Sequence, residues 1–143
     1  MFLYTYVLYG LEKYNILFIL DFSGVLSEPY FTTKPPNVWY VLSGTNVTFR
    51  WVYNNDDEFE ITNVQLTRGP TARSRLLIEY NKVEKVRTFN AKRYSYVPPA
   101  TFKIMNISAS DQDKYRIFIQ SEKVQVRKLK DEMSLQIVSE YNF

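Results

Sequence analysis

The chain of 143 residues contains no cysteine and no histidine, and each absence excludes a kind of site. Without cysteine there can be no disulfide, zinc–thiolate site, iron–sulfur cluster or thiol nucleophile. Without histidine there is no imidazole to act as a general base or a metal ligand. Most familiar hydrolase machinery is therefore missing, and we expect no enzymatic activity, no catalytic residues, no cofactor and no bound metal.

Glycine and proline are also scarce, at four and six residues, which is too few for a fibrous protein. The chain instead holds 12 Tyr, 10 Phe and 2 Trp, an apolar content too high for a disordered chain. The net charge of +3 is mild and gives no reason to expect a nucleic-acid partner. We expect one globular, strand-rich domain with a single hydrophobic core.

The N-terminal segment, residues 1–27, differs from the rest of the chain. After Lys13 comes an apolar run of about 12 residues, too short to cross a bilayer, and small residues follow it at Val25 and Ser27. We interpret residues 1–27 as a secretory signal peptide and residues 28–143 as the mature domain. The alternatives are an uncleaved apolar strand and a short anchor.

Two glycosylation sequons agree with secretion. They are Asn46-Val-Thr and Asn106-Ile-Ser, and neither has proline in its middle position. We therefore expect an extracellular glycoprotein, either secreted or part of a cell-surface receptor.

The apolar pattern predicts an all-β fold. Val47, Phe49, Trp51 and Tyr53 fall on one face of a strand, and nowhere does an apolar period of 3.6 residues persist for three turns. Residues 81–93 carry five basic side chains, and we expect this segment at a sheet edge, where charge discourages further pairing. Strands are expected over residues 38–41, 47–53, 61–67, 76–80, 102–106, 115–120 and 133–138.

Residues 102–117 resemble one protein family. Asp111, Tyr115 and Ile117 are spaced like the aspartate, tyrosine and second cysteine where strand E passes into strand F of an immunoglobulin variable-type (V-set) domain. Residues 44–51 resemble strand B of that family, with Trp51 at the place of the first cysteine. The resemblance covers about residues 36–139 and implies an immunoglobulin-like Greek-key β-sandwich of the V type.

The resemblance also implies structural roles for three residues. The family tyrosine that matches Tyr115 bonds to the backbone at the E–F corner, and a basic residue at the place of Arg93 pairs with the aspartate that matches Asp111. The core tryptophan of strand C is missing, because its place falls near Val64. Among members of the family, the membrane-distal domains of cnidarian allorecognition receptors are similar in departing from these landmarks, and they bind like alleles homophilically.

Packing can replace the absent disulfide. A bridge between positions 51 and 117 would close a loop of about 66 residues, worth roughly 4 kcal/mol in chain entropy. Burying an indole of ~200 Å² at ~25 cal/mol/Å² contributes about 5 kcal/mol. We therefore expect Trp51 to pack on Ile117 between the two sheets.

Neighbouring acids are candidates for acid–base chemistry, but we expect them to be solvated turn residues. Asp111 has a further structural role if it pairs with Arg93. The acidic loop over residues 56–60 lacks the ligand spacing of a calcium loop, so we do not expect a metal there. The three pairs of acids are Asp56 with Asp57, Asp111 with Asp113, and Asp131 with Glu132.

Basic side chains gather in residues 68–93, which hold eight basic and two acidic residues. Two interpretations stay open here. The segment is either a charged sheet edge that keeps the protein soluble, or a docking surface for an anionic glycan or an acidic protein patch. The acidic loop of a second copy is the most economical such patch, and this complementarity fits two-fold self-association.

Phe118 is the leading candidate for a binding residue. Strand parity points it outward if Tyr115 and Ile117 fill the core, and an aromatic beside arginine on a flat sheet is typical of an interface hot spot. We expect a protein-binding face for homophilic recognition or adhesion, or for a related cell-surface receptor. A secreted module for an anionic glycan or lipid is the alternative function. The residues assigned to this face are Phe118, Arg116, Gln120, Gln65 and Asn63.

Overall fold

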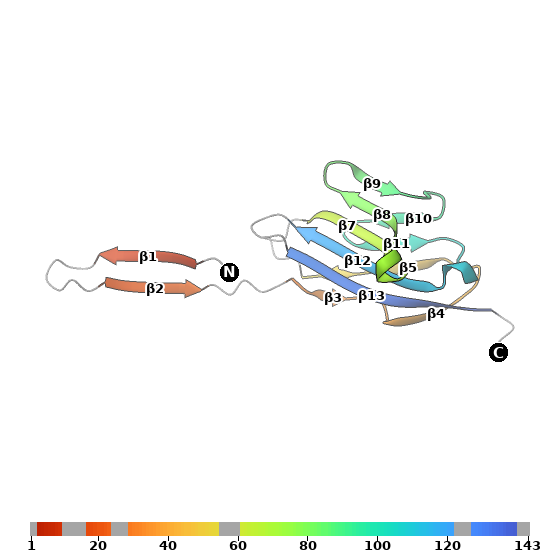
Figure 1. The fold of residues 1–143 in the computed structure, drawn as a ribbon, viewed down its shortest axis with the longest axis horizontal. Helices are drawn as coiled ribbons and strands as arrows, with labels where there is room; N and C mark the ends of the chain where they lie inside the picture. Colours follow the sequence, from red (N-terminus) through yellow and green to blue (C-terminus); the bar gives the residue numbers. More distant parts are fainter. Residues whose placement is uncertain (1–2, 10–16, 24–28, 55–60, 122–126, 140–143) are drawn as a thin grey trace.

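The computed structural model describes residues 3–9, 17–23, 29–54, 61–121 and 127–139. Near the N-terminus, β1 (Leu3–Tyr9) and β2 (Leu17–Ser23) pair antiparallel as a separate two-stranded sheet (Figure 1). Part of the apolar run after Lys13 is therefore a strand. Among the described residues, no helix is long and apolar enough to span a membrane.

Six strands form the front sheet of a sandwich. Neighbouring strands run antiparallel, except that β4 runs parallel to β13. In spatial order the strands are β4 (Val38–Leu42), β13 (Arg127–Val138), β12 (Asp113–Ser121), β7 (Ile61–Arg68), β8 (Arg75–Asn81) and β9 (Lys85–Thr88).

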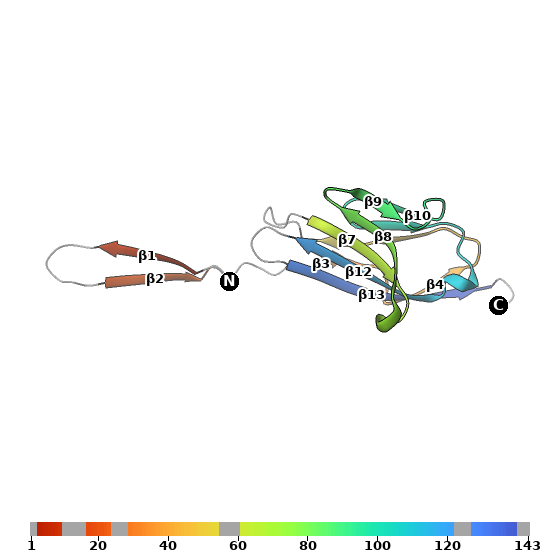
Figure 2. The same ribbon diagram turned by 45° about the horizontal axis from the view of Figure 1, so that its top comes forward.

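A smaller back layer lies behind the front sheet (Figures 1 and 2). Two short 3-10 turns, η1 (Thr71–Arg73) and η2 (Ala109–Asp111), join strands of the sandwich. The all-β sandwich expected from the sequence is confirmed. The back layer consists of β10 (Tyr94–Val97), β11 (Thr101–Ile104) and β5 (Val47–Arg50) in one sheet, and of β3 (Phe31–Thr33) paired with β6 (Val52–Tyr53).

The core lies between the two layers and follows the predicted alternation. Phe49 of β5 and Trp51, which follows it, are fully buried, and so is every second residue of β12 from Tyr115 on. Trp51 and Ile117, the residues at the two cysteine positions, belong to the same buried cluster. The rings of Trp51 and Phe102 meet edge to face with their centroids 6.0 Å apart.

The last strand is longer than the sequence predicted. It begins at Arg127, whereas the sequence predicted a start at Met133. The prediction missed the first half of the strand because the inward-facing positions of β13 include an acid. Leu129 and Met133 face the core, and Asp131 stands between them, directly opposite Ile117 of β12. This acid interrupts the apolar alternation, so the pattern concealed the first half of the strand.

The basic segment over residues 81–93 lies at a sheet edge, as expected. Its strand β9 is the outermost strand of the front sheet on the side of β8. Val86 and Arg87 of β9 are exposed. At the opposite border the outermost strand is β4.

Candidate functional site

The residues assigned to a binding face lie side by side on the outer surface of the front sheet. Phe118 of β12 stands opposite Lys130 of β13 on one side and Gln65 of β7 on the other. Gln120 stands opposite Asn63 in the same way. The strand parity used for the prediction therefore holds on both β12 and β7.

Phe118 is half-buried, and two lysines lie over its ring. The ammonium nitrogens of Lys128 and Lys130 lie 5.8 and 5.6 Å from the centroid of its ring. Such contacts are cation–π interactions, which hold the cations over the aromatic face. The outer surface at Phe118 is therefore an aromatic ring flanked by positive charge.

Arg116 does not extend freely into solvent. Its Nε donates a hydrogen bond of 2.6 Å to Oε2 of Glu132, and its Nη1 donates to the carbonyl oxygen of Gly69. Lys114 donates a second hydrogen bond of 3.1 Å to Glu132. Hydrogen bonds from Lys114 and Arg116 lower the pKa of Glu132 below its usual range, so this carboxylate stays ionised at neutral pH.

Polar side chains on β7 are hydrogen-bonded to a carboxylate on β8. Gln65 Nε2 and Asn63 Nδ2 donate hydrogen bonds of 2.8 and 3.2 Å to the same oxygen of Glu79. These bonds, first from Gln65 and then from Asn63, lower the pKa of Glu79 below its usual range. The β8 side of the face therefore carries a fixed negative charge.

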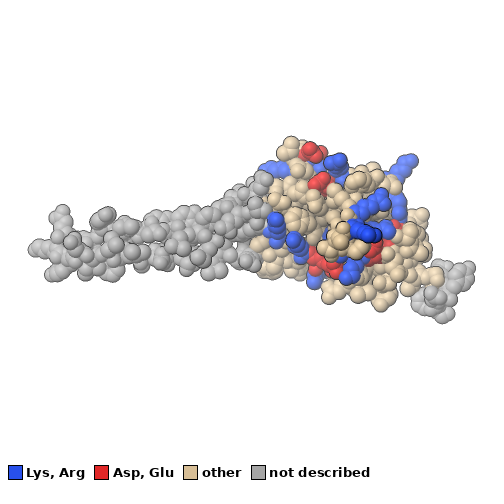
Figure 3. Space-filling model, in the orientation of Figure 1, with Lys and Arg blue, Asp and Glu red and all other residues tan. Residues whose placement is uncertain are grey.

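A groove of about 570 Å³ crosses this face. Its walls come from three strands and from η1, so it runs over the centre of the sheet and not along a loop. Figure 3 views this side of the molecule and shows Lys and Arg interspersed with Asp and Glu. Side chains that line the groove include Gln65, Thr67, Thr71, Arg116, Phe118 and Lys130.

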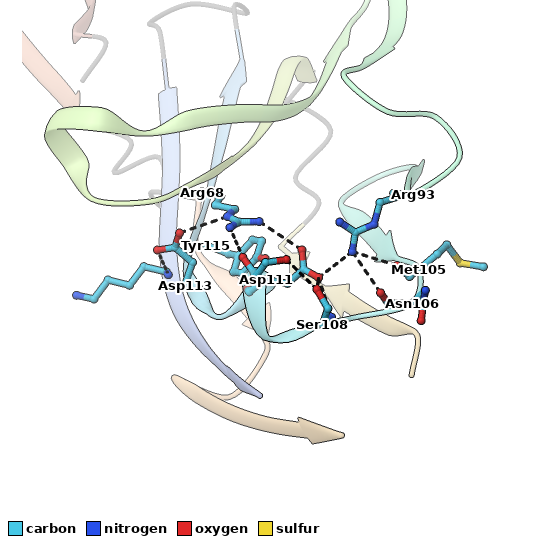
Figure 4. Close-up of polar contacts among 10 residues, drawn as sticks. Arg68, Arg93, Met105, Asn106, Ser108, Asp111, Asp113 and Tyr115 are labelled. Carbon is cyan, nitrogen blue, oxygen red and sulfur yellow. Dashed lines mark hydrogen bonds and ion pairs between the residues drawn. The ribbon is translucent and has the colours of Figure 1, made fainter. Parts of the chain in front are cut away.

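A second polar cluster lies at the turn between β11 and β12, around Asp111 (Figure 4). Asp111 is completely buried, and two arginines reach it. Arg93 lies 2.7 Å from Oδ2 and Arg68 lies 3.3 Å from Oδ1. The pair expected between Arg93 and Asp111 is present, whereas the interpretation of Asp111 as a solvated turn acid is wrong.

The cluster is closed by a tyrosine corner. The hydroxyl of Tyr115 donates a hydrogen bond of 2.7 Å to the backbone oxygen of Asp111. Burial alone would raise the pKa of Asp111, but hydrogen bonds from Arg93 and Ser108 outweigh it and hold that pKa below its usual value. Burial raises the pKa of the Tyr115 hydroxyl, so it remains a donor at physiological pH. This arrangement fixes the corner between β11 and β12.

A third polar contact lies in the core and was not predicted from the sequence. The indole Nε1 of Trp51 donates a hydrogen bond of 2.8 Å to Oδ2 of Asp131, whose other oxygen lies 3.4 Å from Nζ of Lys34. Asp131 and Glu132 therefore lie on a strand, and interpreting them as turn acids was wrong. An acid at an inward position opposite a buried tryptophan was the available signal.

Two of the eight basic side chains in residues 68–93 are engaged in ion pairs at the Asp111 cluster. Arg68 and Arg93 are directed at Asp111, and Arg68 also pairs with Asp113 at 3.3 Å. The acidic loop 56–60 lies outside the described residues. Within the part of the chain that is described, no three carboxylates come together as metal ligands.

The two sequons lie side by side at one end of the sandwich. The backbone N–H of Asn106 donates a hydrogen bond of 2.9 Å to the side-chain oxygen of Asn46. Both asparagines are exposed. Neither asparagine lines the groove on the front sheet.

Comparison with known proteins identifies the fold. No protein-family model and no curated protein matches the sequence. Among solved structures, murine CRIg superposes with a TM-score of 0.65 at 13% identity, covering 78% of this chain and 99% of CRIg. The two tandem V-type regions of VCBP3, a v-region-containing chitin binding protein, give 0.63 at 16% identity, covering 84% of this chain and 50% of theirs.

A third structure agrees with these two. The V domain of amphioxus IgVJ-C2 superposes with a TM-score of 0.56 at 12% identity, covering 69% of this chain and 98% of that domain. The strand order matches as well, because the sheet of β13, β12 and β7 is extended by β8 and β9, the two strands that distinguish V-type domains. The chain has the fold of an immunoglobulin V-type domain, built without cysteine.

Proposed function

We propose that the protein is an extracellular recognition or adhesion module that binds a second copy of itself through the front sheet. The observation that carries the proposal is a single cross-strand row on the outer face. Lys130, Phe118, Gln65 and Glu79 stand opposite one another in that order on β13, β12, β7 and β8. The row is positive at one end, aromatic near its centre and negative at the other end.

This row is complementary to itself under two-fold symmetry. An axis that runs between β12 and β7, parallel to the strands, places β13 of one copy over β8 of the other. Lys130 then faces Glu79 of the second copy, and Phe118 faces Gln65. Opposite charges that meet in this way fix the register of a face and speed its association.

The central groove supports the same function. A buried aromatic at the centre of an interface, surrounded by polar contacts, is the usual composition of a binding hot spot. Phe118 is held under Lys128 and Lys130 before any partner arrives, so less side-chain entropy is lost on binding. No group of the described face is arranged for catalysis, which supports a binding role.

Bead clustering tests this function. Beads coated with the chain should cluster, and Phe118→Arg should strongly reduce the clustering because it buries a charge at the centre of the contact. Phe89→Arg is the matched control, because Phe89 is an exposed aromatic that follows β9. Clustering that is as strong with Phe118→Arg as without it would contradict the proposal. Retention on heparin at physiological salt without clustering would favour an anionic glycan ligand.

A charge swap tests the register. Lys130→Glu and Glu79→Lys should each weaken clustering of identical beads, because like charges then meet across the axis. A mixture of the two variants should cluster again, since each lysine meets a glutamate of the other. Failure of the mixture to cluster would reject this two-fold arrangement.

The extracellular location is part of the proposal, and so are the signal peptide over residues 1–27 and glycosylation at Asn46 and Asn106. N-terminal sequencing of protein recovered from the culture medium should find residue 28 first. Treatment with an N-glycosidase should lower its mass, and Asn46→Gln with Asn106→Gln should remove that effect. Retention in the cytosol of expressing cells would contradict the location.

A further inference from the structure

The border of the front sheet at β4 is an open strand edge (Figure 1). The carbonyl of Asn37 accepts a hydrogen bond of 2.8 Å from the N–H of Ser134, and the N–H of Ser43 donates one of 3.1 Å to Val138. In a parallel ladder, alternate residues direct their N–H and C=O groups at the partner strand. The odd-numbered residues of β4 therefore face β13, and the even-numbered ones face away from the sheet.

Three residues present their backbone groups at this border, namely Val38, Tyr40 and Leu42. Only one of these groups has a partner among the described residues: the carbonyl of Leu42 accepts hydrogen bonds from N–H and Oγ1 of Thr45 at 3.3 and 2.7 Å. Within the part of the chain that is described, the N–H groups of Tyr40 and Leu42 and both groups of Val38 have no partner, so they are available to another strand.

The side chains along the same border are apolar. Val38, Tyr40 and Leu42 are exposed, Tyr40 at 67%. Trp39, on the alternate side, turns inward and packs edge to face on Phe49 with the ring centroids 6.0 Å apart. A valine, a tyrosine and a leucine therefore follow one another along the outer surface of an edge strand.

Proteins usually protect an open edge with charge, proline or a bulge. The opposite border of this sheet follows that rule, because Lys85 and Arg87 stand on β9. At β4 there is no such protection: between Lys34 and Arg50 the sequence contains no charged residue, and its prolines precede the strand. One border of the sheet resists pairing, and the other permits it.

We propose that β4 pairs antiparallel with β4 of a second copy and joins the two six-stranded sheets into one. A two-fold axis at Tyr40 places Val38 opposite Leu42 of the other copy. Each Tyr40 N–H then donates to the other Tyr40 carbonyl, and each Leu42 N–H donates to a Val38 carbonyl. The neutral, apolar strand suits this occupant, because self-pairing sets Tyr40 beside Tyr40 and valine beside leucine, whereas a charge at position 40 would repel its copy.

This contact is separate from the face proposed for recognition. It uses the edge of the sheet, whereas the row through Phe118 uses its outer surface. Two different two-fold contacts on one chain generate an extended array, because each copy can bind one neighbour through the edge and another through the face. The edge contact would thus place recognition faces side by side.

Sedimentation equilibrium of the purified chain tests the edge contact, with Phe118→Arg present throughout to remove the face contact. Tyr40→Pro removes the outward N–H, and proline is tolerated in an edge strand where that N–H faces solvent. We expect a dimer with Phe118→Arg alone. Adding Tyr40→Pro should raise the dissociation constant of this dimer at least about tenfold. Tyr40→Phe keeps the N–H and the ring, and should leave the dissociation constant unchanged.

Tyr40→Lys provides a second variant if proline disturbs the strand, because it sets like charges opposite each other while β4 keeps its ladder to β13.

Hydrogen exchange gives an independent measure of the edge contact. The amides of Tyr40 and Leu42 should exchange more slowly as the protein concentration rises, and Tyr40→Lys should remove that effect. A monomer at high micromolar concentration with Phe118→Arg alone, or a dimer that both Tyr40 variants leave intact, would overturn the edge contact. Neither result bears on clustering through Phe118.

Discussion

The indole of Trp51 is hydrogen-bonded to the carboxylate of Asp131, with Nε1 and Oδ2 2.8 Å apart. Trp51 lies between β5 and β6 of the back layer, and Asp131 lies on β13 of the front sheet, opposite Ile117. In the sequence resemblance to V-type domains, Trp51 and Ile117 match the two cysteines of the family. A polar contact and a buried indole thus connect the sheets where a disulfide usually does.

Removing the acceptor should cost stability. Asp131→Ala leaves the indole N–H buried without a partner, and we expect the free energy of unfolding to fall by about 1–3 kcal/mol. Urea unfolding followed by tryptophan fluorescence measures this. Lys34→Ala is the control: Lys34 is half exposed and pairs with the same carboxylate at 3.4 Å, so its loss should cost less than about 1 kcal/mol.

A double-mutant cycle isolates the contact itself. In a Trp51→Phe background the indole N–H is gone, so Asp131→Ala should cost less than it does in the parent chain. Strictly additive losses would show that Asp131 acts through its surroundings and not through the indole.

The buried carboxylate of Asp111 makes a second prediction. Asp111→Asn leaves Arg68 and Arg93 facing a neutral amide, and breaking a buried ion pair on one side should cost roughly 3 kcal/mol. Chemical denaturation at pH 7 measures the loss. A loss below about 0.5 kcal/mol would contradict a structural role for the ion pairs seen in Figure 4.

The same residue predicts a pH dependence. The folded-state pKa of Asp111 lies below its unfolded value, which is near 3.9 for a model aspartate, so the carboxylate stabilises the fold above that pH. Its contribution is lost as the pH falls through the lower, folded pKa. The difference in stability between the parent and Asp111→Asn should be constant from pH 5 to 8 and should close below about pH 4.

The tyrosine corner can be tested by removing the hydroxyl oxygen of Tyr115. Tyr115→Phe keeps the ring, whose centroid lies 5.3 Å from that of the Phe49 ring, but removes the hydrogen bond to the Asp111 carbonyl. We expect a loss of about 1–2 kcal/mol in thermal or urea unfolding. Tyr96→Phe is a suitable comparison, because its hydroxyl bonds to Pro99 in a more exposed place and its loss should cost less.

Much of the fold could be predicted because apolar alternation and the corner motif are local features of the sequence. Phe49, Tyr115 and Ile117 fall on the core side by parity alone, and spacing relates Tyr115 to Asp111. The start of β13 could not be found in this way. Asp131 takes an inward position where the indole of Trp51, eighty residues away in the chain, and the ammonium of Lys34 satisfy its carboxylate.

The candidate site was predictable in position but not in detail. Parity placed Phe118, Gln65 and Asn63 on one outer face, and the register bears this out. That Lys128 and Lys130 cover Phe118 depends on the pairing of β13, which begins six residues before the predicted start. The partners of a charged side chain depend on tertiary register, which one-strand patterns do not contain.

The central claim is self-recognition through the face at Phe118, and sedimentation equilibrium tests it most directly. The comparison uses the chain with Tyr40→Pro, which removes the edge contact, against the same chain with Phe118→Arg added. We expect concentration-dependent dimers of the first chain and a monomer of the second at high micromolar concentration. A strict monomer in the first chain, or equal dimerisation in both, would contradict it.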